Sequence, residues 1–188
     1  MKRILLGGLL LLLQGCASYQ EESDFVTSQV CEGSSDLPSV LAVQFEPVQD
    51  EQLLNEALGE PEKGMLCQGK VYVSKSDSEV KIYRAWNSTN PNSRYGKWWA
   101  FNKPDGSVAQ YREDYEICYQ WSPLDKMVSC TLKPDTKIVV GNGQSAKCSE
   151  YLTYPVSAKQ QVYIINAPDA VLNCTEYDGV LSWKSSLQ

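Results

Sequence analysis

Apolar residues along the chain fall into two short helical patterns and several strand-like runs. Within residues 50–58, four apolar residues recur at helical spacing, and Gly59 and Pro61 follow directly. This spacing predicts a helix that ends at the glycine and the proline. Ser107 and Gln110 form the pattern of a capping box, and apolar or aromatic residues recur after them at helical spacing. We therefore expect a second helix to begin at Ser107.

Short alternating or continuous apolar runs predict strands, and Gly or Pro residues separate them. The strand candidates are residues 71–73, 80–84, 127–132, 137–140, 161–165 and 180–183. The predicted order is a helix, strands, one helix and further strands. That order favours an α+β fold over a doubly wound α/β fold.

The first fifteen residues have the pattern of a secretory signal peptide. Lys2 and Arg3 precede an apolar run at residues 4–13. This run is much shorter than the roughly 20 residues that a membrane-spanning helix needs. Leu13-Gln14-Gly15-Cys16 resembles the lipobox of bacterial lipoproteins. The resemblance implies cleavage before Cys16 and lipidation of that cysteine, whereas the alternative is an ordinary signal peptide with an incidental cysteine.

The lipobox resemblance also implies a membrane as a partner. Several acyl chains on Cys16 would anchor the protein stably in a bilayer. Ala17 follows the cysteine where an acidic residue often marks inner-membrane retention, so an outer-membrane lipoprotein is favoured, facing the periplasm or the cell surface. We expect a signal peptide at residues 1–15, a lipidated N-terminus and tether at residues 16–48, and a single domain at residues 49–188.

The charge balance and the missing histidine restrict the function classes. The chain has 23 acidic and 17 basic residues and a net charge of −6, so we expect no nucleic-acid partner. It contains no histidine, which excludes Ser-His-Asp and Cys-His catalysis and any histidine-ligated metal. We therefore predict no metal site. An enzyme of this composition would use carboxylates, arginine, hydroxyls, amides or a bound cofactor.

Six cysteines follow Cys16, and an even number in an exported chain predicts up to three disulfides. They are Cys31, Cys67, Cys118, Cys130, Cys148 and Cys174. Many pairings of six cysteines are open, and among them we favour the local pairs Cys118–Cys130 and Cys148–Cys174. The chain has no CxxC pair, which disfavours a zinc site.

Several patches carry residues suited to chemistry. Tyr83-Arg84 closes a predicted strand, Trp98-Trp99 lies in an aromatic run with Tyr111-Arg112 downstream, and Ser149-Glu150-Tyr151-Leu152 follows. In this order the patches resemble the ADP-ribosyltransferase toxins of the cholera and pertussis group and the similar domains of polymorphic bacterial toxins. The resemblance covers about residues 70–167. It implies an α+β domain with a split β-sheet and few helices.

The same resemblance implies cleavage of NAD at the nicotinamide–ribose bond, by an ADP-ribosyltransferase or an NAD glycohydrolase. NAD would be a substrate, no resident cofactor would be needed, and a protein could accept the ADP-ribose. Glu150 would stabilise the oxocarbenium-like transition state, and Arg84 would hold the pyrophosphate or the ribose. The residues implied to bind NAD are Arg84, Trp98, Trp99, Tyr111 and Arg112.

Two departures from the family pattern keep other functions open. Trp98-Trp99-Ala100 stands where the family has a hydroxyl-rich strand, and Cys148 stands where arginine-modifying members have Gln or Glu. These departures favour a non-catalytic outer-membrane lipoprotein that binds a protein, a glycan or a small ligand through its aromatic surface. A purely structural outer-membrane module is a third interpretation. In these interpretations Arg84 is a solvated strand residue and Glu150 a surface-loop residue.

Overall fold

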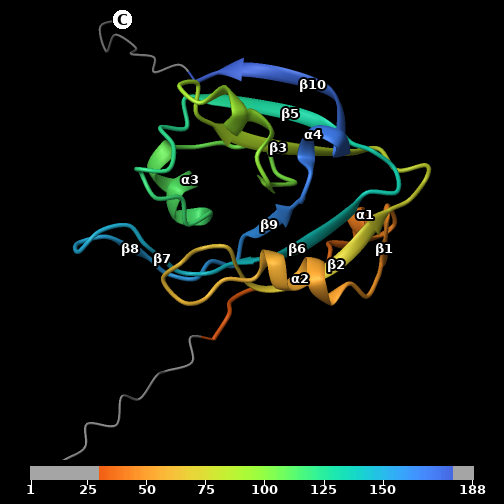
Figure 1. The fold of residues 1–188 in the computed structure, drawn as a ribbon, viewed down its shortest axis with the longest axis horizontal. Helices are drawn as coiled ribbons and strands as arrows, with labels where there is room; N and C mark the ends of the chain where they lie inside the picture. The colour runs from red at the N-terminus through yellow and green to blue at the C-terminus, as the bar shows by residue number, and fades with distance from the viewer. Residues whose placement is uncertain (1–29, 180–188) are drawn as a thin grey trace, which may run out of the picture.

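Strands make up most of the regular structure in the computed structural model, which describes residues 30–179 (Figure 1). The helices are α1 (Ser39–Ala42), α2 (Glu51–Ala57), α3 (Val108–Asp114) and α4 (Ala167–Ala170), with a 3₁₀ helix η1 (Pro91–Tyr95). The strands are β1 (Phe45–Pro47), β2 (Leu66–Ser74), β3 (Val80–Trp86), β4 (Trp98–Trp99), β5 (Lys126–Leu132), β6 (Lys137–Gly143), β7 (Ala146–Lys147), β8 (Thr153–Tyr154), β9 (Gln160–Tyr163) and β10 (Val171–Asp178). The predicted signal peptide, Cys16 and the predicted strand at residues 180–183 lie outside the described residues.

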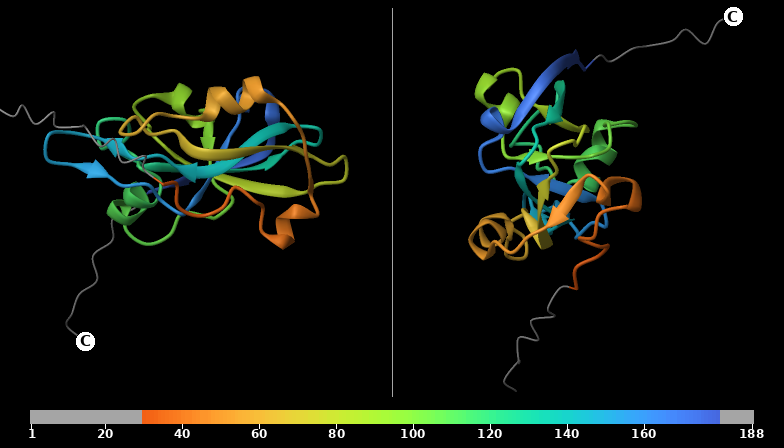
Figure 2. Two further views of the ribbon diagram at one scale, coloured as in Figure 1. Left: turned by 90° about the horizontal axis from the view of Figure 1, so that it is seen from below. Right: turned by 90° about the vertical axis from the view of Figure 1, so that its right-hand side faces the viewer.

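Two antiparallel sheets form the framework. One has the strand order β1-β2-β6-β9-β4, the other has the order β10-β5-β3, and β7 pairs with β8 in a separate hairpin. An isolated bridge between Tyr83 and Ala100 links β3 to the end of β4, so the two sheets meet at that edge. Figure 1 shows β10, β5 and β3 above β2 and β6, and the right-hand view of Figure 2 places β10 at the opposite end of the molecule from α2.

The main hydrophobic core lies between the two sheets. Ile82 and Val128 enter it from the three-stranded sheet, and Ile138, Val140 and Val162 enter it from the five-stranded sheet; all five are fully buried. Alternation along the strands produces this arrangement, because successive side chains point to opposite faces of a sheet. The fold is therefore a β-sandwich with few helices.

Helix α2 covers the outer face of the five-stranded sheet. Leu53 and Ala57 of this helix form a second buried cluster with Leu66, Val71 and Val139 of β2 and β6. Strand β6 is consequently buried on both faces, which explains its continuous apolar run instead of an alternating pattern. Among the described residues, no helix has the length and apolar character needed to cross a bilayer.

The predicted helices are confirmed. The Asp50 side chain accepts a hydrogen bond from Leu53 N at 3.1 Å and caps α2. The Ser107 side chain caps α3 by accepting from Gln110 N at 3.1 Å. The Gln110 amide donates to Asp114 rather than back to Ser107, so only one half of the predicted capping box forms.

Five of the predicted strands correspond to β2, β3, β5, β6 and β9. Strands β2 and β3 follow one another in the sequence but belong to different sheets, so the connection at residues 75–79 crosses the sandwich. The longest strand that the hydrophobic pattern missed is β10, whose residues are mostly exposed because it lies at a sheet edge. The expectation of a mixed fold dominated by sheet, with few helices and disulfide bonds, is confirmed.

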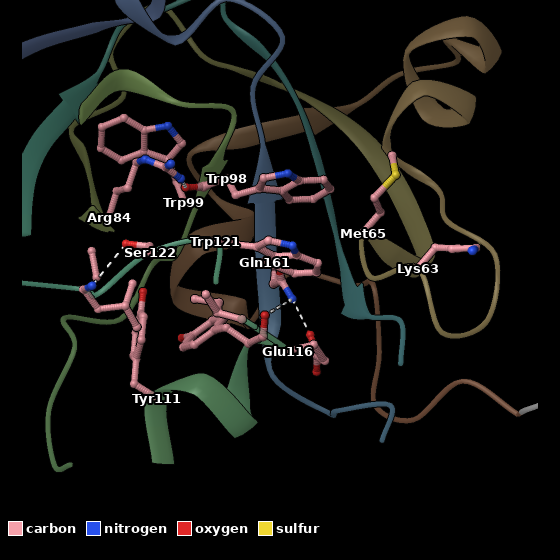
Figure 3. Close-up of a pocket in the computed structure, with 14 residues that line it drawn as sticks. Lys63, Met65, Arg84, Trp98, Trp99, Tyr111, Glu116, Trp121, Ser122 and Gln161 are labelled. Atoms are coloured by element: carbon pink, nitrogen blue, oxygen red, sulfur yellow. Dashed lines mark hydrogen bonds between the residues drawn. The ribbon is translucent and has the colours of Figure 1, made fainter. Parts of the chain in front are cut away.

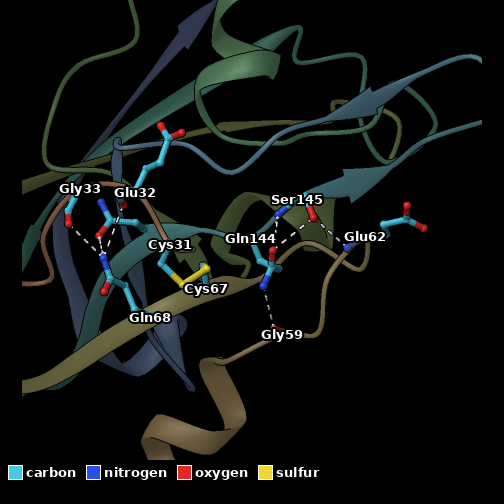
Figure 4. The surroundings of a disulfide bond; sticks show 10 residues. Cys31, Glu32, Gly33, Gly59, Glu62, Cys67, Gln68, Gln144 and Ser145 are labelled. Carbon is cyan, nitrogen blue, oxygen red and sulfur yellow. Dashed lines mark hydrogen bonds between the residues drawn. A yellow bond between two sulfur atoms is a disulfide. The ribbon is translucent and has the colours of Figure 1, made fainter. Parts of the chain in front are cut away.

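The segment before α2 belongs to the folded structure. Strand β1 pairs with β2, and Phe45 is buried in the main core. A disulfide joins Cys31 to Cys67, and the Gln68 amide beside it donates to Gly33 O at 3.1 Å (Figure 4). Residues 30–48, which the sequence pattern assigns to a tether, are therefore held against the five-stranded sheet.

All six predicted disulfide cysteines are paired, as Cys31–Cys67, Cys118–Cys148 and Cys130–Cys174. The two local pairs favoured from the sequence are wrong. Strand β10 lies directly beside β5, so Cys174 reaches Cys130 across the sheet with a Cα–Cα distance of 4.1 Å. Cys118 instead joins the start of the β7–β8 hairpin at Cys148. Strand pairing, rather than closeness in the sequence, decides the partners.

Candidate functional site

A cavity of about 270 Å³ opens where the two sheets meet beside α3 (Figure 3). Its lining includes Arg84, Trp98, Trp99 and Tyr111, four of the residues predicted to form one site. They come from the end of β3, from β4 and from α3. The remaining wall is contributed by β9, by residues 115–124 after α3, and by Lys63 and Met65 before β2. The structure thus brings together most of the predicted binding residues.

Arg84 is a partly buried cation at this site. Its Nε donates to Ser93 O at 2.7 Å, and its Nη1 donates to Trp98 O at 2.6 Å. Gly96 packs against the guanidinium so closely that a Cβ there would overlap it. These contacts hold the 3₁₀ turn and β4 over the end of β3.

The Arg84 guanidinium has no anionic partner among residues 30–179. Burial lowers its pKa from 12.5 to about 10, so the group remains protonated at neutral pH. Its two hydrogen bonds use two of the five N–H groups of a guanidinium, and Nη2 donates to no described residue. The cavity therefore contains one positive charge with donors to spare.

Aromatic side chains give the cavity flat apolar walls. Trp99 is buried, and its Nε1 donates to Gly96 O at 2.8 Å. Trp98 packs on Tyr163 with ring centroids 5.0 Å apart. Trp121 is 53 % exposed and lies against Gly64, where a Cβ would approach the indole to 3.3 Å. Figure 3 shows the Trp98 and Trp121 indoles one above the other with similarly tilted rings.

Glu116 is a buried acid at the floor of the cavity. Its side chain is only 2 % exposed, and Oε2 accepts a hydrogen bond from Gln161 Nε2 at 2.6 Å. Oε1 has no hydrogen-bond partner among the described residues. Burial raises the pKa of this carboxyl to about 9, although Ser157 and Gln161 lower it in part. Glu116 is therefore protonated and uncharged at neutral pH.

The backbone around Glu116 is specialised to hold this carboxyl. Glu116 has a φ of +48°, in the left-handed region that non-glycine residues rarely adopt. Gly143 faces the carboxyl, and a Cβ at that position would overlap it. Glu116 could not be identified from the sequence, because an acid that follows a short amphipathic helix is normally solvated. A single acid between Tyr115 and Ile117 is too weak a signal to indicate a buried carboxyl.

Tyr111 in α3 and Tyr115 at the C-cap of that helix also stay uncharged. Burial raises the pKa of Tyr111 to about 12 and raises that of Tyr115 as well. Their ring centroids lie 4.7 Å apart. Among the described residues that line the cavity, the ionised groups at neutral pH are thus the cations Arg84 and Lys63.

Two predicted site residues lie elsewhere. Arg112 does not line the cavity; its guanidinium donates to the carbonyls of Ile117, Cys118 and Ser122. Glu150 is exposed in the turn of the β7–β8 hairpin, which extends from the edge of the molecule (Figure 1). The predicted catalytic pair of Arg84 and Glu150 is therefore not brought together in the cavity.

Each misplacement has a local cause. Residues 117–122 belong to no helix or strand, so their backbone carbonyls need other donors. Arg112 donates hydrogen bonds to three of these carbonyls. The Ser149–Leu152 motif forms a tight turn, because Cys148 N and Ser149 N both donate to Leu152 O. Tyr151 in that turn is exposed, and the short strand β8 that follows pairs with β7 in a hairpin outside the two main sheets.

No family model, curated protein or solved structure matches this chain.

Proposed function

We propose that this protein is a binding module that holds a small planar ligand in the cavity beside α3. The observation that carries the proposal is the cavity itself, of about 270 Å³, with the indoles of Trp98 and Trp121 on its walls. Binding sites for small molecules are typically preformed hollows with apolar walls and a few polar groups. Arg84, Glu116 and Gln161 supply such groups here.

The size of the cavity limits the ligand. Sites for drug-sized molecules occupy about 300–1,000 Å³. A cavity of about 270 Å³ suits a ligand of one or two rings with a short substituent. Flat rings gain from stacking on indole faces, in addition to the apolar area that they bury.

Cleavage of NAD is less well supported by the same residues. Arg84, Trp98, Trp99 and Tyr111 line one cavity, as the resemblance to ADP-ribosyltransferases implies. Stabilising an oxocarbenium-like transition state requires an ionised carboxylate, however. Glu150 lies outside the cavity, and Glu116 is protonated. An ADP-ribosyltransferase-like core is thus a hypothesis based on the sequence motifs, and ligand binding is the function that we propose.

The proposed place of action is the outside of the cytoplasmic membrane, with Cys16 as the lipid anchor. Three disulfides support an oxidising compartment, because cytosolic thiols are kept reduced. The lipobox sequence supports export and anchoring. An aromatic cavity on an anchored domain would then collect its ligand from the cell envelope or its surroundings.

Isothermal titration calorimetry with an uncharged planar probe, 2-naphthamide, tests the proposal. We expect one site per chain in the unmodified protein, and Trp121→Ala should weaken binding about tenfold, because truncating an aromatic anchor costs more than about 1 kcal/mol. Tyr151→Ala is the matched control, since Tyr151 is an exposed aromatic outside the cavity. Equal binding by the two variants, or no binding by the unmodified protein to either 2-naphthamide or its carboxylate analogue, would contradict the proposal.

A further inference from the structure

We infer that the natural ligand of this cavity is a planar monocarboxylate whose carboxylate pairs with the free donors of Arg84. This inference rests on the proposed ligand-binding function and specifies the chemical class of the ligand. Arg84 is the group that determines this class, because it lines the cavity, is partly buried there, and lacks an anionic partner among the described residues.

The distribution of charge supports an anionic ligand. The chain as a whole is acidic, with a net charge of −6, yet the described cavity wall carries cationic groups and one protonated acid. A buried charge without a partner is costly. Two backbone carbonyls solvate Arg84 but do not neutralise it. A bound carboxylate would supply the missing charge and would accept hydrogen bonds from Nη2.

The geometry favours a single negative charge. Lys63 is exposed, and Figure 3 shows Lys63 and Arg84 at opposite sides of the group of labelled residues. Only one partly buried guanidinium is therefore available to the acid group of a ligand. One guanidinium matches one carboxylate, which would accept hydrogen bonds from the N–H groups that Ser93 and Trp98 leave free. The indoles of Trp98 and Trp121 remain to contact the planar part of the ligand.

The acid at the floor of the cavity does not favour cationic ligands. Glu116 is the acid that lines the described wall, and its carboxyl is protonated and bonded to Gln161. It consequently offers no negative charge to an ammonium group at neutral pH. An amine of the same shape would meet Arg84 and Lys63 with no compensating anion, so we expect it to be rejected.

A matched set of probes tests the inference on the unmodified protein. We would titrate 2-naphthoate, 2-naphthamide and 2-naphthylmethylammonium at pH 7 and low salt by calorimetry. The carboxylate should bind about tenfold or more tightly than the amide, as a charge-assisted hydrogen bond in a buried site would give, and the ammonium should bind most weakly. The net charge of −6 opposes this order, so the preference has to come from the cavity.

Two substitutions locate the source of the preference. Arg84→Gln and Lys81→Gln each remove one cation from β3 and change the net charge equally, but Lys81 is exposed and does not line the cavity. We expect Arg84→Gln to bind the carboxylate and the amide alike, and Lys81→Gln to keep the preference. Because Arg84 also bonds to Ser93 and Trp98, Arg84→Gln could fail to fold. A crystal structure of the unmodified protein with 2-naphthoate then decides the question, and it should place the carboxylate on Arg84 Nη2.

The outcomes separate the inference from the proposed function. Equal binding of all three probes would overturn the monocarboxylate class and leave the binding function in place. Loss of the preference in Lys81→Gln, or a carboxylate placed away from Arg84, would overturn the role of Arg84. Failure of every probe to bind would overturn the binding function together with the inference.

Discussion

Unfolding free energy should fall less with rising pH in the Glu116→Gln variant than in the unmodified protein, between mildly acidic and neutral pH. Burial raises the pKa of the carboxyl from 4.5 to about 9. Between these values the folded protein holds a proton that the unfolded chain releases. The contribution of Glu116 to the free energy of unfolding is therefore most favourable below pH 4.5, falls as the pH rises, and levels off above the pKa of the folded state.

The size of the effect follows from that single proton. Each pH unit within the window changes the free energy of unfolding by about 1.4 kcal/mol. From about pH 5.5 to about pH 7.5, Glu116 should lower it by about 2–3 kcal/mol. Asp114 adds to the rise in pKa, whereas Ser157 and Gln161 oppose it. A Gln at this position can still accept from Gln161 and can place its amide where Oε1 lies, so it mimics the protonated acid at every pH.

Urea unfolding, followed by tryptophan fluorescence with the disulfides intact, measures this dependence. The free energy of unfolding is obtained at several pH values from the midpoint and the m-value. Glu116→Gln should show a shallower fall with pH than the unmodified protein and should be more stable at neutral pH. Glu113→Gln is the control, because it removes an exposed acid from the last turn of α3, close to Glu116 in the sequence, and should leave the slope unchanged. Parallel curves for Glu116→Gln and the unmodified protein would refute the assignment of a buried, protonated carboxyl.

Two further predictions concern Glu150 and Cys16. Glu150→Gln should not change the NAD consumption of the purified protein, measured by chromatography, because Glu150 is exposed outside the cavity. If the protein cleaves NAD and this substitution lowers turnover about 100-fold, the enzyme hypothesis replaces the binding module. Cys16→Ser should release the protein from membranes or block its maturation, as fractionation and immunoblotting would show. Unchanged membrane partition after washing would contradict lipidation at Cys16.

Local features of the fold could be predicted because their causes are local. The helical spacing before Gly59 and the Ser107 cap depend on neighbouring residues, and α2 and α3 form where expected. Arg84 and Trp98 were also expected to share a site, because the order of their motifs resembles that of ADP-ribosyltransferases, and both line the cavity. Strand partners could not be predicted in this way. Nothing near Cys130 in the sequence indicates that β10 will lie beside β5.

The missed and misplaced site residues depend on contacts between distant segments. Glu116 is buried because Gly143 leaves room for its carboxyl and Gln161 bonds to it, and both lie far along the chain. Glu150 resembles a catalytic residue by its neighbours in the sequence, but the hairpin that carries it turns away from the cavity. Its position depends on where β7 pairs with β8, which the Ser149–Leu152 motif does not specify.

The connectivity of the disulfides has a consequence for how the chain would acquire its structure under the proposed export. Cys118–Cys148 and Cys130–Cys174 are interlaced, since one member of each pair lies between the members of the other. A chain that enters an oxidising compartment from its N-terminus presents Cys118, Cys130 and Cys148 before Cys174 arrives. A premature bond between Cys118 and Cys130 would then have to be exchanged through a mixed disulfide. Efficient maturation should consequently depend on a disulfide isomerase, whereas Cys31–Cys67 can close as soon as both residues have emerged.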